Sequence, residues 1–194
     1  MKKTFVTIMA VLSLFLFGSA GVDAQEALPC ENGGRGFQAE EMRDGFLLVE
    51  FVGVACDDEE SAEELFDRLE EGYTDAYEEY LADQGADLEP FEEIDDNDFP
   101  DLWDEQVGYS TTGSLNDVEA EITIVIVRIG SDVHVVIGIG ATDVEEDVLS
   151  FAVQYYDDDL EGDTIMDRIP DEDDLPGFVM VVENEPDDEE GTVG

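Results

Sequence analysis

Residues 118–140 carry the pattern that most constrains the fold, two runs of alternating aliphatic residues joined by a short turn. Alternation with a period of two is typical of strands that bury one face. Gly130 and Ser131 suit a two-residue type II′ turn, with glycine at the first central position. The resulting register makes one sheet face a continuous aliphatic surface, with three facing pairs: Ile126 with Val135, Ile124 with Ile137, and Ile122 with Ile139.

The opposite face of this hairpin is shallow, because glycines interrupt the larger residues of the return strand. The positions concerned are His134, Val136, Gly138 and Gly140. Missing side chains allow the close approach of another molecule, so we interpret this face as the first candidate binding surface. The alternative is that a loop, a helix or a second copy of the chain covers it.

Three further strands and two amphipathic helices are expected elsewhere in the chain. Clusters of β-branched and bulky apolar residues predict strands at 45–55, about 106–112 and 178–182, the first of them buried on both faces. Helices are expected from Ser61 to about residue 83 and from Thr142 to about residue 157. In both, a glutamate stands three residues after the hydroxyl residue, which is the spacing of a capping box.

The order strand, helix, meander, helix, strand predicts the α+β class. We expect one antiparallel sheet, a meander with a long central hairpin, and both amphipathic helices packed on its aliphatic face. A length of about 170 residues suits a single domain, placed here at 25–183. Segments expected outside the core are a glycine-rich leader at 31–35, acidic linkers at 92–101 and 157–174, and an acidic disordered tail at 184–194.

Residues 1–24 have the three parts of a secretory signal peptide, namely basic residues, an apolar run and small residues. Cleavage after Ala24 is favoured, and a cut after Ala20 also fits. The apolar run is about 13 residues, fewer than the roughly 20 that a helix needs to cross a bilayer. We therefore expect an exported protein, secreted or held in the cell envelope, with no membrane span in the mature chain.

Cys30 and Cys56 are the two cysteines of the chain, and both follow the signal peptide. A structural disulfide is the expected state of such a pair in an exported protein. A redox-active or metal-binding pair of thiols would require a close Cys-x-x-Cys spacing, which the sequence lacks.

The net charge of this chain determines the salt concentration at which the folded state can be stable. The sequence holds 54 acidic and 7 basic residues, a net charge of −47, and no lysine follows Lys3. Self-repulsion of this size opposes compaction, whereas at about 1 M salt the Debye length falls to about 3 Å. The composition therefore predicts adaptation to high salt, with loose association of cations.

The motifs of several enzyme classes are missing. The one histidine lies in a predicted strand, and the sequence contains no nucleophile elbow, zinc-protease motif, P-loop or dinucleotide fingerprint. Nucleic acids are disfavoured as partners because the five arginines are scattered. Arg128, at the end of the hairpin, could bind an anion, but pairing with a neighbouring carboxylate is favoured. No catalytic residue, cofactor or metal ligand is assigned.

Calcium is the most plausible ion for the acidic loops. Asp157, Asp159, Glu161 and Gly162 mimic the first half of an EF-hand loop, but Arg168 stands where the bidentate glutamate belongs. The run of Asp95, Asn97 and Asp98 likewise lacks the glycine turn. A dedicated calcium site is therefore not predicted.

One favoured function and two alternatives follow. The favoured one is a secreted, highly acidic, salt-adapted, non-catalytic domain that binds an unknown protein or small-molecule ligand. The alternatives are a carboxylate-based secreted hydrolase, which needs two convergent, partly buried carboxylates in a cleft, and a calcium-binding extracellular protein.

Overall fold

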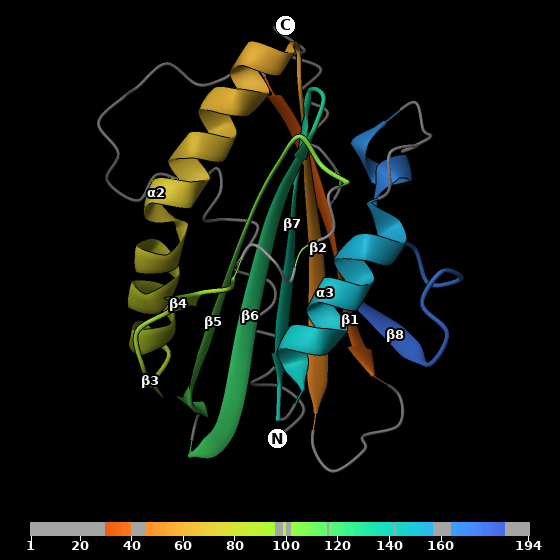
Figure 1. The fold of residues 1–194 in the computed structure, drawn as a ribbon. Helices are drawn as coiled ribbons and strands as arrows, with labels where there is room; N and C mark the ends of the chain where they lie inside the picture. Colours follow the sequence, from red (N-terminus) through yellow and green to blue (C-terminus); the bar gives the residue numbers. More distant parts are fainter. Residues whose placement is uncertain are drawn as a thin grey trace, which may run out of the picture.

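A sheet of eight antiparallel strands forms the centre of the molecule (Figure 1). The computed structural model describes residues 30–39, 46–95, 99, 102–115, 117–141, 143–156 and 164–184. The strand order is β3-β5-β6-β7-β2-β1-β8, and β4 also pairs with β5. The bounds are β1 (Cys30–Ala39), β2 (Leu47–Cys56), β3 (Ala86–Leu88), β4 (Glu92–Glu93), β5 (Glu105–Leu115), β6 (Val118–Ile129), β7 (Asp132–Gly140) and β8 (Phe178–Asn184). Together with two α-helices, this arrangement confirms the predicted α+β class.

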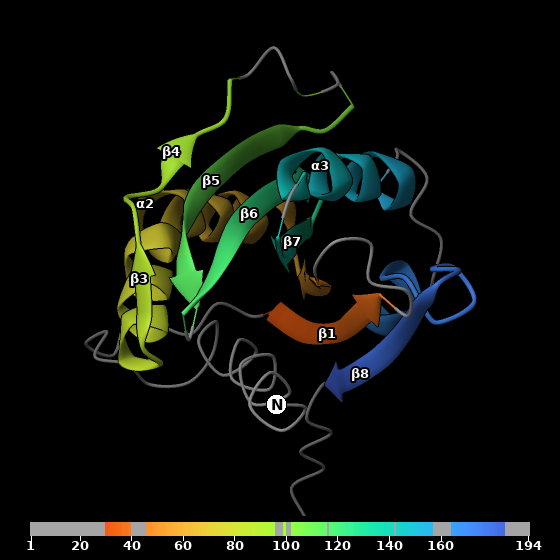
Figure 2. The ribbon, with the colours of Figure 1, turned by 90° about the horizontal axis from the view of Figure 1, so that it is seen from below.

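The two helices lie on opposite faces of the sheet, on either side of β6 and β7 (Figure 2). Helix α2 (Glu59–Asp83) covers the aliphatic face, as expected. Helix α3 (Val144–Tyr155) covers the glycine-lined face, so the prediction that both helices share the aliphatic face is wrong. The central strands are consequently buried on both sides, and every residue of β7 is buried.

The central hairpin forms as predicted. Ile122, Ile124 and Ile126 of β6 face Ile139, Ile137 and Val135 of β7. The turn is two residues long, and Gly130 takes a positive φ of 58° while Ser131 does not. This geometry fits the first central position of a type II′ turn. Hairpin register is thus fixed locally, by alternation and by one glycine.

Helix α2 begins two residues before the predicted start. Asp58 is its N-cap, and the Asp58 carboxylate accepts a hydrogen bond of 2.8 Å from the Ser61 backbone N–H. A carboxylate at this position also interacts favourably with the helix dipole, which explains why the cap is Asp58 and not Ser61. For α3, Thr142 lies outside the described residues, and the N-cap is Asp143. The buried stripe of α2 is Ala62, Phe66, Leu69, Tyr73, Tyr77, Tyr80 and Leu81.

The segment predicted as a glycine-rich leader is in fact a strand. Residues 31–35 belong to β1, which pairs with β2 on one side and β8 on the other. Glycine has no side chain to contribute to the apolar alternation that predicts a strand. Gly33, Gly34 and Gly36 therefore leave β1 without a recognisable strand pattern. Cys30 and Cys56 stand directly opposite each other in the β1–β2 ladder and form the predicted disulfide.

Parts of both predicted acidic linkers also join the core. Ile94 and Phe99 are buried in the first, and Ile165 and Ile169 in the second. The second also contains a short 3-10 helix, η2 (Ile165–Arg168). Apolar residues spaced singly among carboxylates are enough to dock irregular chain on a sheet. Within the predicted tail, Asn184 ends β8, and residues 185–194 lie outside the description, as does the predicted signal peptide.

Candidate functional site

The shallow face of β7 is not a surface in this structure. His134 and Val136 have no exposed area, and α3 lies directly over the glycines. A Cβ added to Gly138 would overlap Val148 Cγ2 and lie 2.8 Å from Val144 Cγ1. A Cβ on Gly140 would lie 2.8 Å from Val144 Cγ2. Of the two interpretations of this face, covering by a helix is therefore the one observed, because the glycines make room for the valines of α3.

His134 is a buried, neutral side chain. Its ring stacks on the ring of Tyr156 with 4.2 Å between centroids. Burial, and then the nearby positive charge of Arg168, lower the pKa of His134 to about 3. Both ring nitrogens lie without a hydrogen-bond partner among the described atoms.

An acidic groove lies at the end of the sheet where β3, β5 and β6 meet. Its volume is about 850 Å³. The lining residues are Asp87, Leu88, Glu89, Thr112, Gly113, Ser114, Glu119, Ala120, Glu121, Ala141 and Asp143. Five of these are carboxylates and none is cationic, so the groove favours a positively charged occupant.

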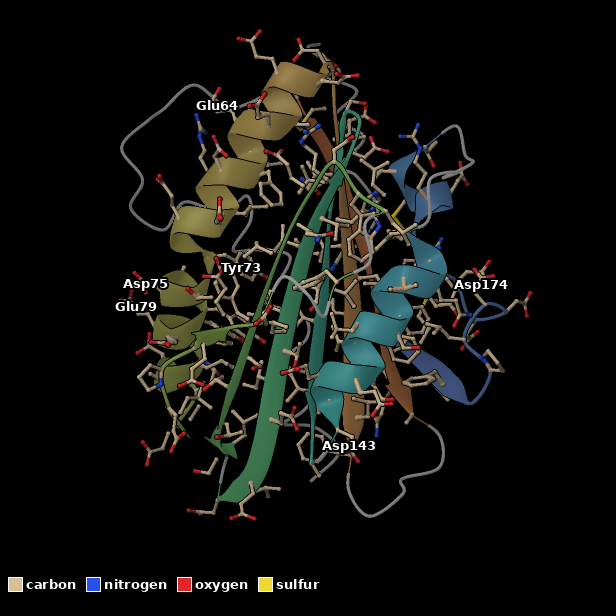
Figure 3. The ribbon with its side chains drawn as sticks, in the orientation of Figure 1. Glu64, Tyr73, Asp75, Glu79, Asp143 and Asp174 are labelled. Carbon is tan, nitrogen blue, oxygen red and sulfur yellow. A yellow bond between two sulfur atoms is a disulfide. The ribbon has the colours of Figure 1, made fainter. Side chains whose placement is uncertain are left out.

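Backbone contacts shape this acidic groove. Gly113 faces Leu88 across the β3–β5 ladder, and a Cβ on Gly113 would lie 2.7 Å from Leu88 Cα. Glycine therefore allows β3 to close one wall. At the other wall Glu121 Oε1 accepts a 3.2 Å hydrogen bond from Glu145 N, at the start of α3. Asp143, labelled in Figure 3, adjoins it with a left-handed φ of 57°.

Sequence reasoning did not find this groove. Its carboxylates come from segments far apart in the chain, and in a sequence with 54 acidic residues no single one carries a signal. The glycine of the run Thr-Thr-Gly-Ser at 111–114 was the one available hint, because a glycine inside a strand often marks a close backbone approach.

Within the described residues, no group of three or more histidine, cysteine or acidic side chains is arranged to hold a metal ion. The EF-hand-like residues Asp157, Asp159, Glu161 and Gly162 lie outside those residues, as do Asn97 and Asp98. In the same part of the chain, no helix is long and apolar enough to cross a membrane.

All four arginines that the structure describes pair with carboxylates. Arg128 contacts Glu105 and Asp104 and donates a 3.1 Å hydrogen bond to Gly130 O. The favoured prediction for Arg128, an ion pair, is confirmed. The remaining pairs are Arg35 with Glu183, Arg68 with Glu64, and Arg168 with Asp132.

Glu50 is a buried carboxyl group beneath α2. It lies on β2 between Ile137 of β7 and Gly36 of β1, is 3% exposed, and its Oε2 has no hydrogen-bond partner among the described atoms. Burial raises the pKa of Glu50 from its usual 4.5 to about 8. Tyr73 and Tyr77 of α2, the former pointing towards the sheet in Figure 3, have pKa values raised by burial and by the nearby Glu50.

Glu50 does not line the acidic groove. A carboxylate-based hydrolase would need a carboxyl group of raised pKa facing a second carboxylate in a cleft. Among the described residues, the carboxyl group of raised pKa (Glu50) lies outside the groove that holds the clustered carboxylates. This arrangement gives the hydrolase alternative no support.

We predict that Gly138→Ala lowers the free energy of unfolding by about 2 kcal/mol, because overpacking a filled core typically costs 1–3 kcal/mol. The matched control is Gly72→Ala on α2, where an added Cβ meets nothing within 4 Å. Alanine should stabilise that helix by up to about 1 kcal/mol. Urea unfolding of both variants measures the difference, and equal stability of Gly138→Ala and wild type would contradict the close packing of α3.

We predict that Glu50→Gln stabilises the protein increasingly as pH rises. A carboxyl group with a folded-state pKa above its unfolded value favours the folded state most below pH 4.5, and this advantage declines up to about pH 8. The gain from the amide should therefore grow from pH 5 to pH 8 by at most about 1.4 kcal/mol per pH unit. Urea unfolding across this range, with the exposed Glu71→Gln as control, checks the prediction, and a pH-independent difference would refute it.

Comparison with known proteins found no family model, no curated protein and no solved structure that matches this chain. Functional inference therefore depends on the charge, the packing and the acidic groove of the molecule itself.

Proposed function

We propose that this protein is an exported, salt-adapted, non-catalytic binding domain, and that its acidic groove holds a cationic ligand or a basic segment of a partner protein. The observation that carries the proposal is the groove itself, an 850 Å³ hollow lined by five carboxylates and no cation. Export is favoured by the signal-peptide pattern of residues 1–24 and by the Cys30–Cys56 disulfide.

The ion pairs of the described arginines support the proposal that the groove carboxylates bind a cationic ligand. Arg35, Arg68, Arg128 and Arg168 are each engaged by carboxylates of the chain. The groove carboxylates Asp87 of β3 and Glu119 of β6 are exposed and lie in one row across the sheet, on either side of Ser114 of β5. A ligand with two or more separated positive charges can therefore contact both carboxylates at once.

Salt adaptation is supported by the distribution of charge on the fold. The outer side of α2 carries acidic residues along its whole length, and Asp75 and Glu79 point away from the sheet in Figure 3. Such rows repel one another strongly at low ionic strength and weakly when the Debye length is about 3 Å.

We predict that the melting temperature rises by at least about 10 °C between 0.05 M and 3 M sodium chloride, since a few kcal/mol of relieved repulsion shifts the melting temperature by 2–4 °C per kcal/mol at this size. Circular dichroism melts measure this shift. A flat melting temperature would refute salt adaptation, and rescue at low salt by millimolar calcium alone would favour the calcium-binding alternative.

We predict that Asp87→Asn with Glu119→Gln weakens binding of spermine, a tetravalent cationic probe, by at least tenfold. The control is Asp67→Asn with Glu71→Gln on the exposed side of α2, which removes the same charge and should change the affinity less than twofold. Isothermal titration calorimetry at 0.5 M sodium chloride makes the comparison, because non-specific attraction is largely screened there. Equal losses in the two variants would contradict a groove site.

A further inference from the structure

Residues 164–175, called the strap here, cover the glycine-lined face of the sheet beside α3. Beneath the strap, Gly33 of β1 and Gly53 of β2 stand opposite each other. A Cβ on Gly53 would lie 2.8 Å from Ile165 Cδ1, and one on Gly33 would overlap the sulfur of Met166. The apolar side chains of the strap thus fill the space that the two glycines leave.

Side-chain contacts hold the strap in place. Arg35 donates hydrogen bonds to Ile169 O (3.0 Å) and Pro170 O (3.3 Å), and Arg168 pairs with Asp132 of β7. Tyr155 of α3 donates a 2.5 Å hydrogen bond from its hydroxyl to Asp174 O.

Two backbone–backbone hydrogen bonds close local turns within the strap, Asp167 N to Thr164 O and Asp174 N to Asp171 O. Where the strap continues into β8, Phe178 N donates to Leu175 O and Met180 N donates to the Glu172 carboxylate. Within the described chain, residues 164–174 make no backbone–backbone hydrogen bond to a strand. The side-chain contacts of the strap can therefore break while the hydrogen bonds between the strands remain.

The strap closes over polar groups that lack partners. Asp132 Oδ1, both ring nitrogens of His134 and the Tyr156 hydroxyl are buried without a hydrogen bond among the described atoms. Asp132 and His134 are two residues apart on β7 and face the same side, and the rings of His134 and Tyr156 stack. Burying polar groups without partners is unfavourable, so hydration of these three side chains favours an open strap.

We propose that the strap opens while the sheet remains folded, and that opening uncovers Asp132, His134 and Tyr156 as a second, latent site for a small polar molecule that both donates and accepts hydrogen bonds. This site is independent of the acidic groove. It adjoins Gly53 of β2, which is paired with His134 in the β2–β7 ladder, and the strap serves as its cover. Local opening of this kind occurs in segments that are not held by the backbone hydrogen bonds of a sheet.

His134 is the one histidine of the chain, which makes it a unique reporter of strap opening. Diethyl pyrocarbonate acylates an exposed neutral imidazole, and mass spectrometry locates the product. The rate in folded protein at 2 M sodium chloride, divided by the rate in urea-unfolded chain, gives the opening constant. We expect this constant to exceed the global unfolding constant from urea titration by at least tenfold. Equality of the two constants would overturn the proposal.

Two variants test the attachment of the strap. Arg168→Gln removes the ion pair to Asp132, and Tyr155→Phe removes the hydroxyl contact to Asp174 while keeping the ring. Each should raise the ratio of opening to global unfolding constants at least threefold. Arg68→Gln, which breaks the exposed Arg68–Glu64 pair on α2, should leave the ratio unchanged. If Arg168→Gln does not fold, Tyr155→Phe decides, and an unchanged ratio in Tyr155→Phe would overturn the role of the strap.

Discussion

Burial of the central strands on both faces is the constraint on which the rest of this molecule depends. Residues of β2, β6 and β7 contact α2 on one side and α3 with residues 164–175 on the other. Fully burying an aliphatic side chain contributes about 1.5–3 kcal/mol, and this attraction does not weaken as salt screens charge. It is the term that can hold a chain of net charge −47 together.

The two faces of the sheet achieve that burial differently. On the α2 face, large aliphatic residues meet tyrosines, and Glu50 is enclosed beneath α2, where burial raises the pKa of its carboxyl group to about 8. On the α3 face, Gly138 and Gly140 bring the helix backbone close to the sheet, and Gly33 and Gly53 admit residues of the strap. The first face buries Glu50 and the tyrosines Tyr73 and Tyr77, and Glu50 Oε2 and the Tyr77 hydroxyl have no hydrogen-bond partner among the described atoms. The second face buries Asp132 Oδ1, both ring nitrogens of His134 and the Tyr156 hydroxyl in the same state.

The four arginines that the structure describes all form ion pairs within the fold. Arg128 secures the hairpin end, Arg35 and Arg168 secure the strap, and Arg68 pairs along α2. Of these ion pairs, Arg68–Glu64 is exposed and contributes little by itself, whereas the side chains of Arg35, Arg128 and Arg168 are mostly buried. The acidic groove thus faces solvent with its negative field uncompensated by the residues that line it.

The sequence by itself determined the elements whose signals are local. Alternation and one turn glycine determined the register of β6 and β7, periodic apolar residues determined both helices, and a single pair of cysteines determined the disulfide. Only the tertiary structure decided that residues 31–35 form part of a strand, because glycines carry no alternation. It also decided that α3 covers the face of His134, since alternation defines two faces without stating what packs on each. The acidic groove arises in the same way, from carboxylates that distant strands bring together.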